Sequence, residues 1–361
     1  MSPSKLIIAL LGALFACANC AVIISPQDKR ILWEGRWANE SSAIRTAGWS
    51  LTGVTIKCTG TSYVSFHVKD KDSSVKSYYI VQVNSEDRYS GPNSDEGFVV
   101  RGLNPAEAYV VRLIKRGEMN HGPSSLVSIE LEDGGSLVEY KYPYNHRIEF
   151  VGDSITCGYG ALGLNYSCHY SITNSDATKS YSYLTAKRFN AEINVECWSG
   201  KGLLRNYGDT KWRSDDNMVD DYEYIVHSEY VPSWDSKWNH SLYHPELIVI
   251  NLGTNDYSPS STYVPSDEQF TAAYVEFMTS LLKNTPTAHI IAACSTVTTC
   301  CRNTEAAVKK MAAAGHKTHY VHLPDLNTET DYGCDWHPNF NGHRKYADTI
   351  IKYIEENLGW N

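Results

Sequence analysis

Short segments in which hydrophobic and polar residues alternate fill the first part of the chain. The clearest one is YVVRLIK at residues 109–115, and turn residues such as SGPN at residues 90–93 separate the segments. We expect strands over residues 54–58, 63–68, 77–83, 97–100, 108–115 and 125–131. Several short strands at this spacing, with no helical period between them, are typical of a sandwich or a barrel. We therefore predict an all-β sandwich (jelly-roll) domain over residues 21–145.

From residue 146 the pattern changes, because apolar strands now alternate with amphipathic helices. The expected strands are 147–151, 192–197, 247–252, 289–293 and 319–323, and the expected helices are 179–190, 267–283, 305–314 and 338–357. Strands that alternate with helices form a parallel sheet with helices on both faces. The predicted fold class of residues 146–361 is therefore α/β, a three-layer α/β/α domain with five parallel strands, preceded by the all-β domain.

The first 20 residues have the form of a signal peptide. Lys5 precedes an apolar run from Leu6 to Phe15, and small residues follow at positions 16–18. This run is too short to span a membrane, and no other apolar run is long enough to do so. We expect residues 1–20 to be removed and the mature protein to be secreted, without a membrane partner.

Composition and charge narrow the possible partners. The formal net charge of −9 and the pI near 5.8 argue against binding to nucleic acid or to an anionic membrane surface. The 25 Tyr and 9 Trp are side chains that stack well on sugar rings, although most of them are expected in the core. Three sequons, at Asn39, Asn165 and Asn239, are potential N-glycosylation sites in a eukaryotic host.

Cysteine usage agrees with export. Of the 10 cysteines, Cys17 and Cys20 lie in the predicted signal peptide, and the other eight are expected to be mostly paired in an oxidising compartment. They include no C-x-x-C pair, so a zinc site is disfavoured and no metal is expected.

The segment RIEFVGDSITCGYG, residues 147–160, carries the first candidate for chemistry. Its apolar start reads as a buried strand, and Gly152-Asp153-Ser154 breaks the run before a helix can begin. Open α/β sheets place their sites at such strand ends, where Ser154 can be a nucleophile if a base is near. The alternative is that Asp153 or Ser154 only caps the following helix.

Three further segments follow predicted strands and can converge on Ser154. They are Trp198-Ser199-Gly200-Lys201-Gly202, Gly253-Thr254-Asn255-Asp256 and Cys334-Asp335-Trp336-His337-Pro338. His337 would accept the Ser154 proton, and the N–H groups of Ser154 and Gly200 with the Asn255 amide would bind a developing oxyanion. Gly202 is an alternative donor to Gly200, and Asp256 is expected to hold neighbouring loops. His322 and His343 are poorer candidates for the base, because they lie within a predicted strand and helix.

This set of blocks resembles the SGNH (GDSL) hydrolases, in order and in separation. GRWA at 35–38, VRLIKR at 111–116, SGKGLLRNYGD at 199–209, WDSKW at 234–238, PELIVINLGTND at 245–256 and CDWHPNFNGH at 334–343 further resemble carbohydrate esterase family 2. That family combines an N-terminal jelly roll with a flavodoxin-like SGNH domain and deacetylates plant polysaccharides such as xylan.

The resemblance implies Ser154 as nucleophile, His337 as base, and Ser154, Gly200 and Asn255 as the oxyanion hole. Most SGNH enzymes place an acid three residues before the histidine, where this chain has Cys334. Asp335 is therefore the expected third catalytic residue, with a backbone carbonyl as the alternative partner of His337. Trp234, Trp238, Tyr257 and Trp336 are the candidate substrate-binding residues.

The resulting expectation is a secreted carbohydrate O-acetyl esterase that acts on acetylated polysaccharide or oligosaccharide without a cofactor. The alternatives are an SGNH lipase or phospholipase, and a glycan-binding protein with a vestigial esterase site. We also hypothesise that Cys300 or Cys301 bonds to Cys334 and fixes the His337 loop.

Overall fold

The computed structural model describes residues 20–41, 43–72, 74–142, 144–231, 235–258, 263–295 and 298–361. All of the predicted signal peptide except residue 20 lies outside the described residues. Among the described helices, none combines the length and the apolar composition needed to cross a membrane.

Two antiparallel sheets pack face to face in the N-terminal half. One sheet has the order β3 (Ala38–Ser41), β4 (Ile44–Ala47), β11 (Ser124–Leu131), β6 (Tyr63–Asp70), β9 (Phe98–Arg101), with β1 (Val22–Ile24) also paired to β11. The other has the order β12 (Ser136–Val138), β5 (Gly53–Thr59), β10 (Ala108–Lys115), β7 (Tyr78–Val83), β8 (Glu86–Pro92), with β2 (Leu32–Glu34) also paired to β5. Alternate residues of these strands, such as Val54 and Ile56, fill the core between the sheets. The expected jelly-roll-like sandwich is confirmed.

A parallel sheet forms the centre of the C-terminal half. Its order is β14 (Ala191–Cys197), β13 (His146–Gly152), β15 (Leu247–Asn251), β16 (His289–Cys294), β17 (Thr318–His322), and these five strands in the described chain are those that the sequence predicts. The order reverses at β13, so the crevice at the carboxyl ends of β13 and β15 is where a site is expected in such a sheet.

Helices cover both faces of this sheet. Alternate residues of β15 point to opposite sides, so that Leu247 and Val249 pack with α2 (Tyr181–Arg188) and α6 (Phe340–Leu358), while Ile248 and Ile250 pack with α4 (Asp267–Asn284) and α5 (Thr298–Ala313). α4 begins at a capping box formed by Ser266 and Gln269. α5 begins at Thr298, seven residues before the predicted start, because Cys300 and Cys301 are buried against the sheet as part of the helix.

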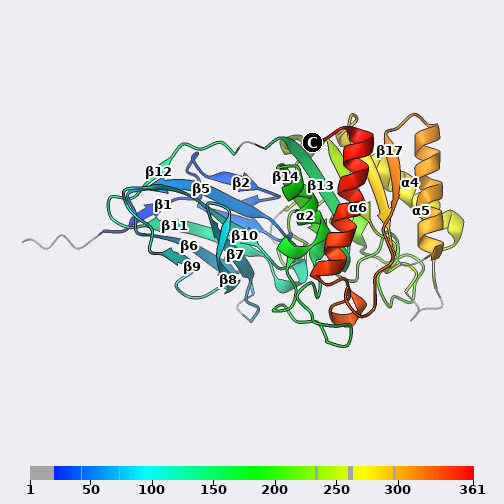
Figure 1. Ribbon diagram of the computed structural model, residues 1–361, viewed down its shortest axis with the longest axis horizontal. Helices are drawn as coiled ribbons and strands as arrows, with labels where there is room; N and C mark the ends of the chain where they lie inside the picture. The colour runs from blue at the N-terminus through cyan, green and yellow to red at the C-terminus, as the bar shows by residue number, and fades with distance from the viewer. Residues whose placement is uncertain are drawn as a thin grey trace, which may run out of the picture.

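The sandwich packs against the edge of the parallel sheet (Figure 1). The buried Arg36 makes ion pairs of 2.9 Å with Glu149 on β13 and 2.8 Å with Glu196 on β14. The Trp49 indole N–H donates to the Tyr224 carbonyl at 2.8 Å. The two halves are therefore joined by buried polar contacts as well as by apolar packing.

Three disulfides lie in the described C-terminal half, and they correct one expectation. Cys334 bonds to Cys168, whereas Cys301 bonds to Cys294 and Cys300 is free. The third disulfide joins Cys157 to Cys197. The hypothesis that Cys300 or Cys301 bonds to Cys334 is wrong, because Cys301 at the start of α5 lies beside Cys294 at the end of β16.

Candidate active site

Ser154 lies at the carboxyl end of β13, as the first residue of the short helix α1 (Ser154–Cys157). Asp153 provides the helix cap, since its Oδ1 accepts the Ile155 N–H at 3.0 Å. Burial raises the pKa of Asp153 to about 7, although the Ile155 N–H opposes the shift. The capping function and the serine hydroxyl thus belong to neighbouring residues, which leaves Ser154 Oγ free for another partner.

That partner is His337, which follows the short 3₁₀ helix η4 (Cys334–Trp336). His337 Nε2 lies 2.7 Å from Ser154 Oγ, within hydrogen-bond distance. Burial lowers the pKa of His337, so its imidazole is neutral and able to accept a proton. The Tyr159 ring stacks on the imidazole with 3.9 Å between ring centroids and covers one face of it. The pair has the geometry of a serine activated by a general base.

The group that orients His337 is a main-chain carbonyl. His337 Nδ1 lies 3.0 Å from the Asp335 carbonyl oxygen, whereas the Asp335 carboxylate accepts from the Tyr159 hydroxyl at 2.7 Å and the Tyr170 N–H at 2.8 Å. His169 Nδ1 lies 3.0 Å from the same carboxylate. The expected contact between the Asp335 carboxylate and His337 is therefore not formed. The reason is local: Asp335 and Trp336 have φ of +50° and +62°, which turns the Asp335 carbonyl toward the imidazole and its side chain toward Tyr159.

Gly200 lines the same cavity as Ser154 and His337, and its N–H has no protein acceptor. In residues 198–207, which the structure describes completely, each backbone N–H except that of Gly200 donates to a protein acceptor. The acceptors are, in chain order, the Gly152 carbonyl, the Glu118 carboxylate, the Trp198 carbonyl, Asn206 Oδ1, the Asp256 carboxylate for three N–H groups, Ser214 Oγ and the Gly200 carbonyl. The alternative donor Gly202 is thus occupied by Asn206, and the structure favours Gly200.

Asn255 lies beside the same opening. Its Nδ2 donates to the Lys201 carbonyl at 2.8 Å and to Asp153 Oδ2 at 3.4 Å, a long hydrogen bond that a ligand oxygen can replace. The neighbouring Asp256 is fully buried and accepts the N–H groups of residues 203–205, so its expected loop-holding role is confirmed.

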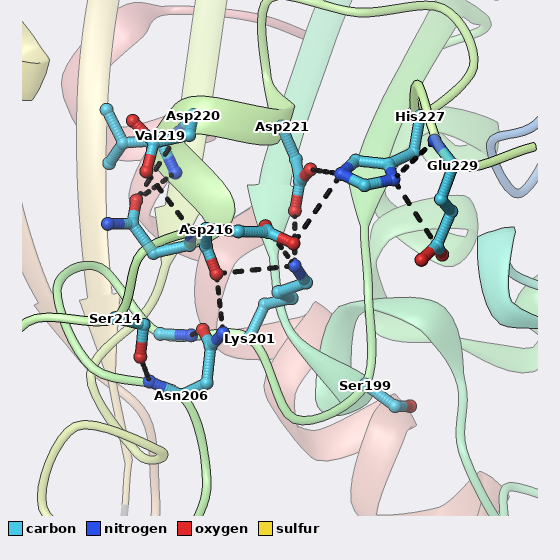
Figure 2. A network of polar contacts seen from close by, with 12 residues as sticks. Ser199, Lys201, Asn206, Ser214, Asp216, Val219, Asp220, Asp221, His227 and Glu229 are labelled. Atoms are coloured by element: carbon cyan, nitrogen blue, oxygen red, sulfur yellow. Dashed lines mark hydrogen bonds and ion pairs between the residues drawn. The ribbon is translucent and has the colours of Figure 1, made fainter. Parts of the chain in front are cut away.

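A partly buried polar network anchors the same loop on its other side (Figure 2). Lys201 Nζ lies 2.8 Å from Asp221 Oδ2 and also contacts Asp216. His227 Nε2 lies 3.3 Å from Asp221 Oδ1 and 3.5 Å from Asp216 Oδ2. In the described chain, Asp216, Asp221 and His227 are close enough together to hold a metal ion. The Lys201 ammonium already pairs with both carboxylates there, so the cluster is better explained as an anchor of the loop.

Two cavities meet at Ser154 and His337. One of about 330 Å³ extends over Tyr159, Ser199 and Gly200. The other, of about 350 Å³, is lined by Tyr207, Tyr257, Tyr332 and Trp336 among others. Gly200 lines the first, so a carbonyl bound there would lie near the Gly200 N–H, and the second offers aromatic faces beside it.

The four predicted substrate-binding residues do not all lie at the cavity. Trp336 and Tyr257 line the aromatic cavity, and Trp336 is 56% exposed while its ring stacks on Tyr166 at 4.1 Å. Trp238 does not reach the site, because it packs under the Arg36 guanidinium, 5.2 Å from its ring centroid, where the two halves of the molecule meet. Trp234 lies outside the described residues.

Comparison with known proteins places this geometry in a family. Residues 150–345 match the GDSL-like lipase/acylhydrolase family. The chain belongs to this family.

The chain is 33% identical over 269 residues to cellulase/esterase CelE of Acetivibrio thermocellus, covering 73% of this chain and 31% of CelE. It is 33% identical over 183 residues to an acetylxylan esterase/glucomannan deacetylase of Cellvibrio japonicus, covering 50% of this chain and 48% of that protein. The chain thus spans only about a third to a half of these two relatives.

The structural comparison extends the resemblance to both halves. A family two carbohydrate esterase from Clostridium thermocellum, solved in complex with cellohexaose, has a TM-score of 0.81 and 28% identity, covering 92% of this chain and 100% of that chain. The resemblance to the GDSL-like family and to carbohydrate esterase family 2 that the sequence predicts is confirmed.

Other contacts of this GDSL-like site were not predicted from the sequence. Tyr159 lies within the block that identified Ser154, but nothing distinguishes it from the other 24 tyrosines until it is seen to stack on His337. Glu118 comes from the sandwich and reaches Ser199 only through the packing of the two halves. Neither residue belongs to a spacing pattern that a sequence reader can follow.

Proposed function

We propose that this protein is a secreted carbohydrate O-acetyl esterase that removes acetyl groups from a plant cell-wall polysaccharide, xylan or glucomannan, through Ser154. The observation that carries the proposal is the 2.7 Å contact between Ser154 Oγ and His337 Nε2 beside the unoccupied N–H of Gly200. Such a set binds an ester carbonyl and attacks it, and it requires neither a metal nor an organic cofactor.

The reaction follows from the positions of these groups. The Asp335 carbonyl accepts the Nδ1–H of His337, which leaves the lone pair of Nε2 toward Ser154. As Ser154 Oγ bonds to the acetyl carbon, Nε2 takes the hydroxyl proton, and the N–H groups of Ser154 and Gly200 with the Asn255 amide stabilise the oxyanion. His337 then returns the proton to the leaving sugar oxygen. Water, deprotonated by the same nitrogen, then attacks the acetyl carbon. As the bond to Ser154 Oγ breaks, His337 returns the proton to Oγ and acetate leaves.

The aromatic cavity supports a sugar as the leaving group. Trp336 and Tyr207 are 56% and 63% exposed beside Ser154, and exposed rings of this kind stack on pyranose faces. A neutral polymer also meets no repulsion from a chain of net charge −9. The names of the related acetylxylan esterase and glucomannan deacetylase agree with this substrate class.

Secretion is supported by the N-terminal apolar segment and by the three disulfides, which persist in oxidising compartments. Asn39, Asn165 and Asn239 are exposed, so their side chains are accessible for N-glycosylation in a host that carries it out.

The test is acetate release from acetylated xylan and acetylated glucomannan by the wild type and by Ser154→Ala. We expect release by the wild type and a loss of about 10³-fold or more in the variant, as for removal of a serine nucleophile. A series of aryl esters provides the second readout, with acetate preferred over long acyl chains. Preference for long chains would indicate a lipase, and polymer binding without acetate release would indicate a glycan-binding protein.

A further inference from the structure

Glu118, from the sandwich, touches the loop that carries Gly200. It directly precedes the 3₁₀ helix η1 (Met119–His121) and is 3% exposed. Its Oε2 accepts the Ser199 N–H at 2.6 Å, and its Oε1 accepts the Ser199 hydroxyl at 2.7 Å. One carboxylate thus holds both the main chain and the side chain of the residue before Gly200. We propose that Glu118 is a positioning residue that fixes the Gly200 N–H toward the oxyanion, an inference that rests on the proposed function.

We call the two hydrogen bonds from Ser199 to the Glu118 carboxylate the clamp. The conformation of Gly200 explains why its N–H needs to be held in this way. Gly200 has φ of +82°, and a Cβ added to it would meet nothing nearer than Tyr207 Cβ at 4.0 Å. The Cβ position of Gly200 is therefore open, and the direction of the peptide group between Ser199 and Gly200 depends on hydrogen bonds around it. The Gly200 carbonyl accepts the Tyr207 N–H at 2.8 Å, and side chains fix the residues on either side of Gly200. Lys201 is fixed by Asp221 and Asp216 (Figure 2), and Ser199 is fixed by Glu118.

The surroundings of Glu118 disfavour its charged form. Burial raises the pKa of this carboxyl to about 7, although the two Ser199 bonds and the nearby Lys115 oppose the shift. Lys115 is itself fully buried and donates to the Gly122 carbonyl at 3.2 Å instead of pairing directly with Glu118. A buried carboxylate whose close hydrogen bonds go to one serine is a poor stabiliser of the interface. Its geometric contribution is to hold that serine in place.

The interface does not depend on this contact. Arg36 makes two buried ion pairs with the parallel sheet, and the Trp49 indole N–H donates to the Tyr224 carbonyl. These contacts join the two halves without touching residues 199–201. Loss of the Glu118 carboxylate is therefore expected to affect the oxyanion loop more than the docking of the sandwich.

The experiment compares Glu118→Met, which has similar length and no comparable acceptor, with Glu118→Gln. The glutamine can still accept the Ser199 N–H through Oε1 and donate to the Ser199 hydroxyl through Nε2. With an aryl acetate as substrate, we expect Glu118→Met to lower kcat by about 10- to 100-fold with little change in KM, which is less than complete removal of an oxyanion donor. Glu118→Gln should restore kcat to within about threefold of the wild type.

Two further variants keep the test decisive. Ser50→Ala removes a buried bond of 3.2 Å to the Gly117 carbonyl, next to Glu118, and should leave kcat and KM unchanged. If Glu118→Met does not fold, Ser199→Ala deletes one of the two clamp bonds from the loop side and should still lower kcat with KM retained.

The outcomes separate this inference from the proposed function. If wild-type activity survives in Ser154→Ala, the esterase mechanism itself fails. If Ser154→Ala is inactive while folded Glu118→Met, or folded Ser199→Ala in its place, keeps the wild-type kcat, the esterase stands and the role of Glu118 is overturned. An equal loss in Glu118→Met and Glu118→Gln would also overturn it, because the clamp geometry would then not be what matters.

Discussion

At the scale of single residues, His337 is the side chain whose surroundings determine the chemistry. Its Nδ1 faces a main-chain carbonyl, its Nε2 faces Ser154, and Tyr159 covers its ring. The Asp335 carboxylate acts on it only through its charge, because its oxygens are taken by Tyr159, Tyr170 and His169. The site therefore resembles a dyad with a charged neighbour more than a triad.

We expect Asp335→Asn to lower kcat/KM by about 10-fold or less, whereas loss of a directly bonded triad aspartate costs about 10⁴-fold. The variant keeps the carbonyl that orients His337 and one side-chain oxygen for the Tyr159 hydroxyl. Initial rates with an aryl acetate give the answer, and near-ultraviolet circular dichroism checks that the aromatic packing is intact. A loss of about three orders of magnitude in kcat/KM in a folded variant would mean that the Asp335 carboxylate is the third member of a catalytic triad.

The pH profile tests the environment of His337. Burial lowers its pKa below the ordinary value of about 6.5, so the neutral, proton-accepting form persists to lower pH. The acid limb of kcat/KM should therefore have its midpoint below 6.5. The negative charge of Asp335 raises the His337 pKa. In Asp335→Asn this pKa should therefore be lower, and the acid limb of kcat/KM should lie at still lower pH. A shift toward neutral pH in that variant would contradict the assigned interaction.

How much of the site the sequence predicts depends on where each residue lies. Ser154, Gly200, Asn255 and His337 follow predicted elements of one parallel sheet, whose topology brings them to one edge. Glu118 comes from the other half of the molecule, so its part in the site depends on packing that the sequence pattern does not show.

The wrong expectation for Trp238 has a similar physical cause. An aromatic residue in a long loop packs into an interface or faces a cavity according to its tertiary neighbours. Here the Arg36 guanidinium lies over the Trp238 ring, and both belong to the boundary between the two halves.

At the scale of elements, the loop that carries His337 is held by its neighbour over residues 160–168. Gly160 and Gly163 lie so close to Cys334 that a Cβ on either would approach its backbone nitrogen to 2.9 and 2.6 Å. The Cys168–Cys334 disulfide and the bond from the Asp335 N–H to the Cys168 carbonyl, at 2.9 Å, join the two loops. These contacts maintain the positive φ of Asp335 that turns its carbonyl toward His337.

Replacing Cys168 and Cys334 together by serine should lower the free energy of unfolding by about 2–4 kcal/mol, the usual range for a native disulfide. We also expect a fall in kcat, because the Asp335 carbonyl loses its restraint. Urea unfolding and ester hydrolysis measure the two effects. Cys58→Ser is the matched control, because this buried cysteine is unpaired and lies in the core of the sandwich. Peptide mapping of the wild type should recover Cys168 linked to Cys334.

The accuracy of the predicted elements depends on their length and burial. The strands of the parallel sheet are five to seven residues long and rich in buried apolar residues, and the sequence places each end to within a residue or two. β1 to β4 and β12 have only three or four residues, too few to show an alternation, and were missed. β8 was missed although it has seven residues, because they are mostly polar and exposed, and the turn expected at 90–93 is wrong since residues 90–92 belong to this strand. The first turn of α5 was missed because it consists of threonine and cysteine, which are weak helix formers, and the burial of Cys300 and Cys301 decides its conformation.

At the scale of the whole molecule, the sandwich supports a loop of the candidate site from outside the cavities. Arg36 from the sandwich is fully buried between Glu149 and Glu196, and the Tyr222 hydroxyl donates to Glu149 at 3.0 Å. The same interface brings Glu118 to Ser199. Catalytic competence and the docking of the two halves are therefore expected to be lost together on unfolding.

This coupling is tested by breaking the buried ion pairs. Arg36→Met leaves Glu149 and Glu196 buried without their shared cation, and removing one partner of such a pair costs about 3–5 kcal/mol. Calorimetry should show one cooperative transition for the wild type, at a temperature well above that of the variant. Arg30→Met is the control, because Arg30 pairs with Asp28 at the surface, where such a pair contributes about 0–1 kcal/mol. Two separate transitions in the wild type, with only the lower one abolishing ester hydrolysis, would mean that the sandwich and the parallel sheet unfold independently.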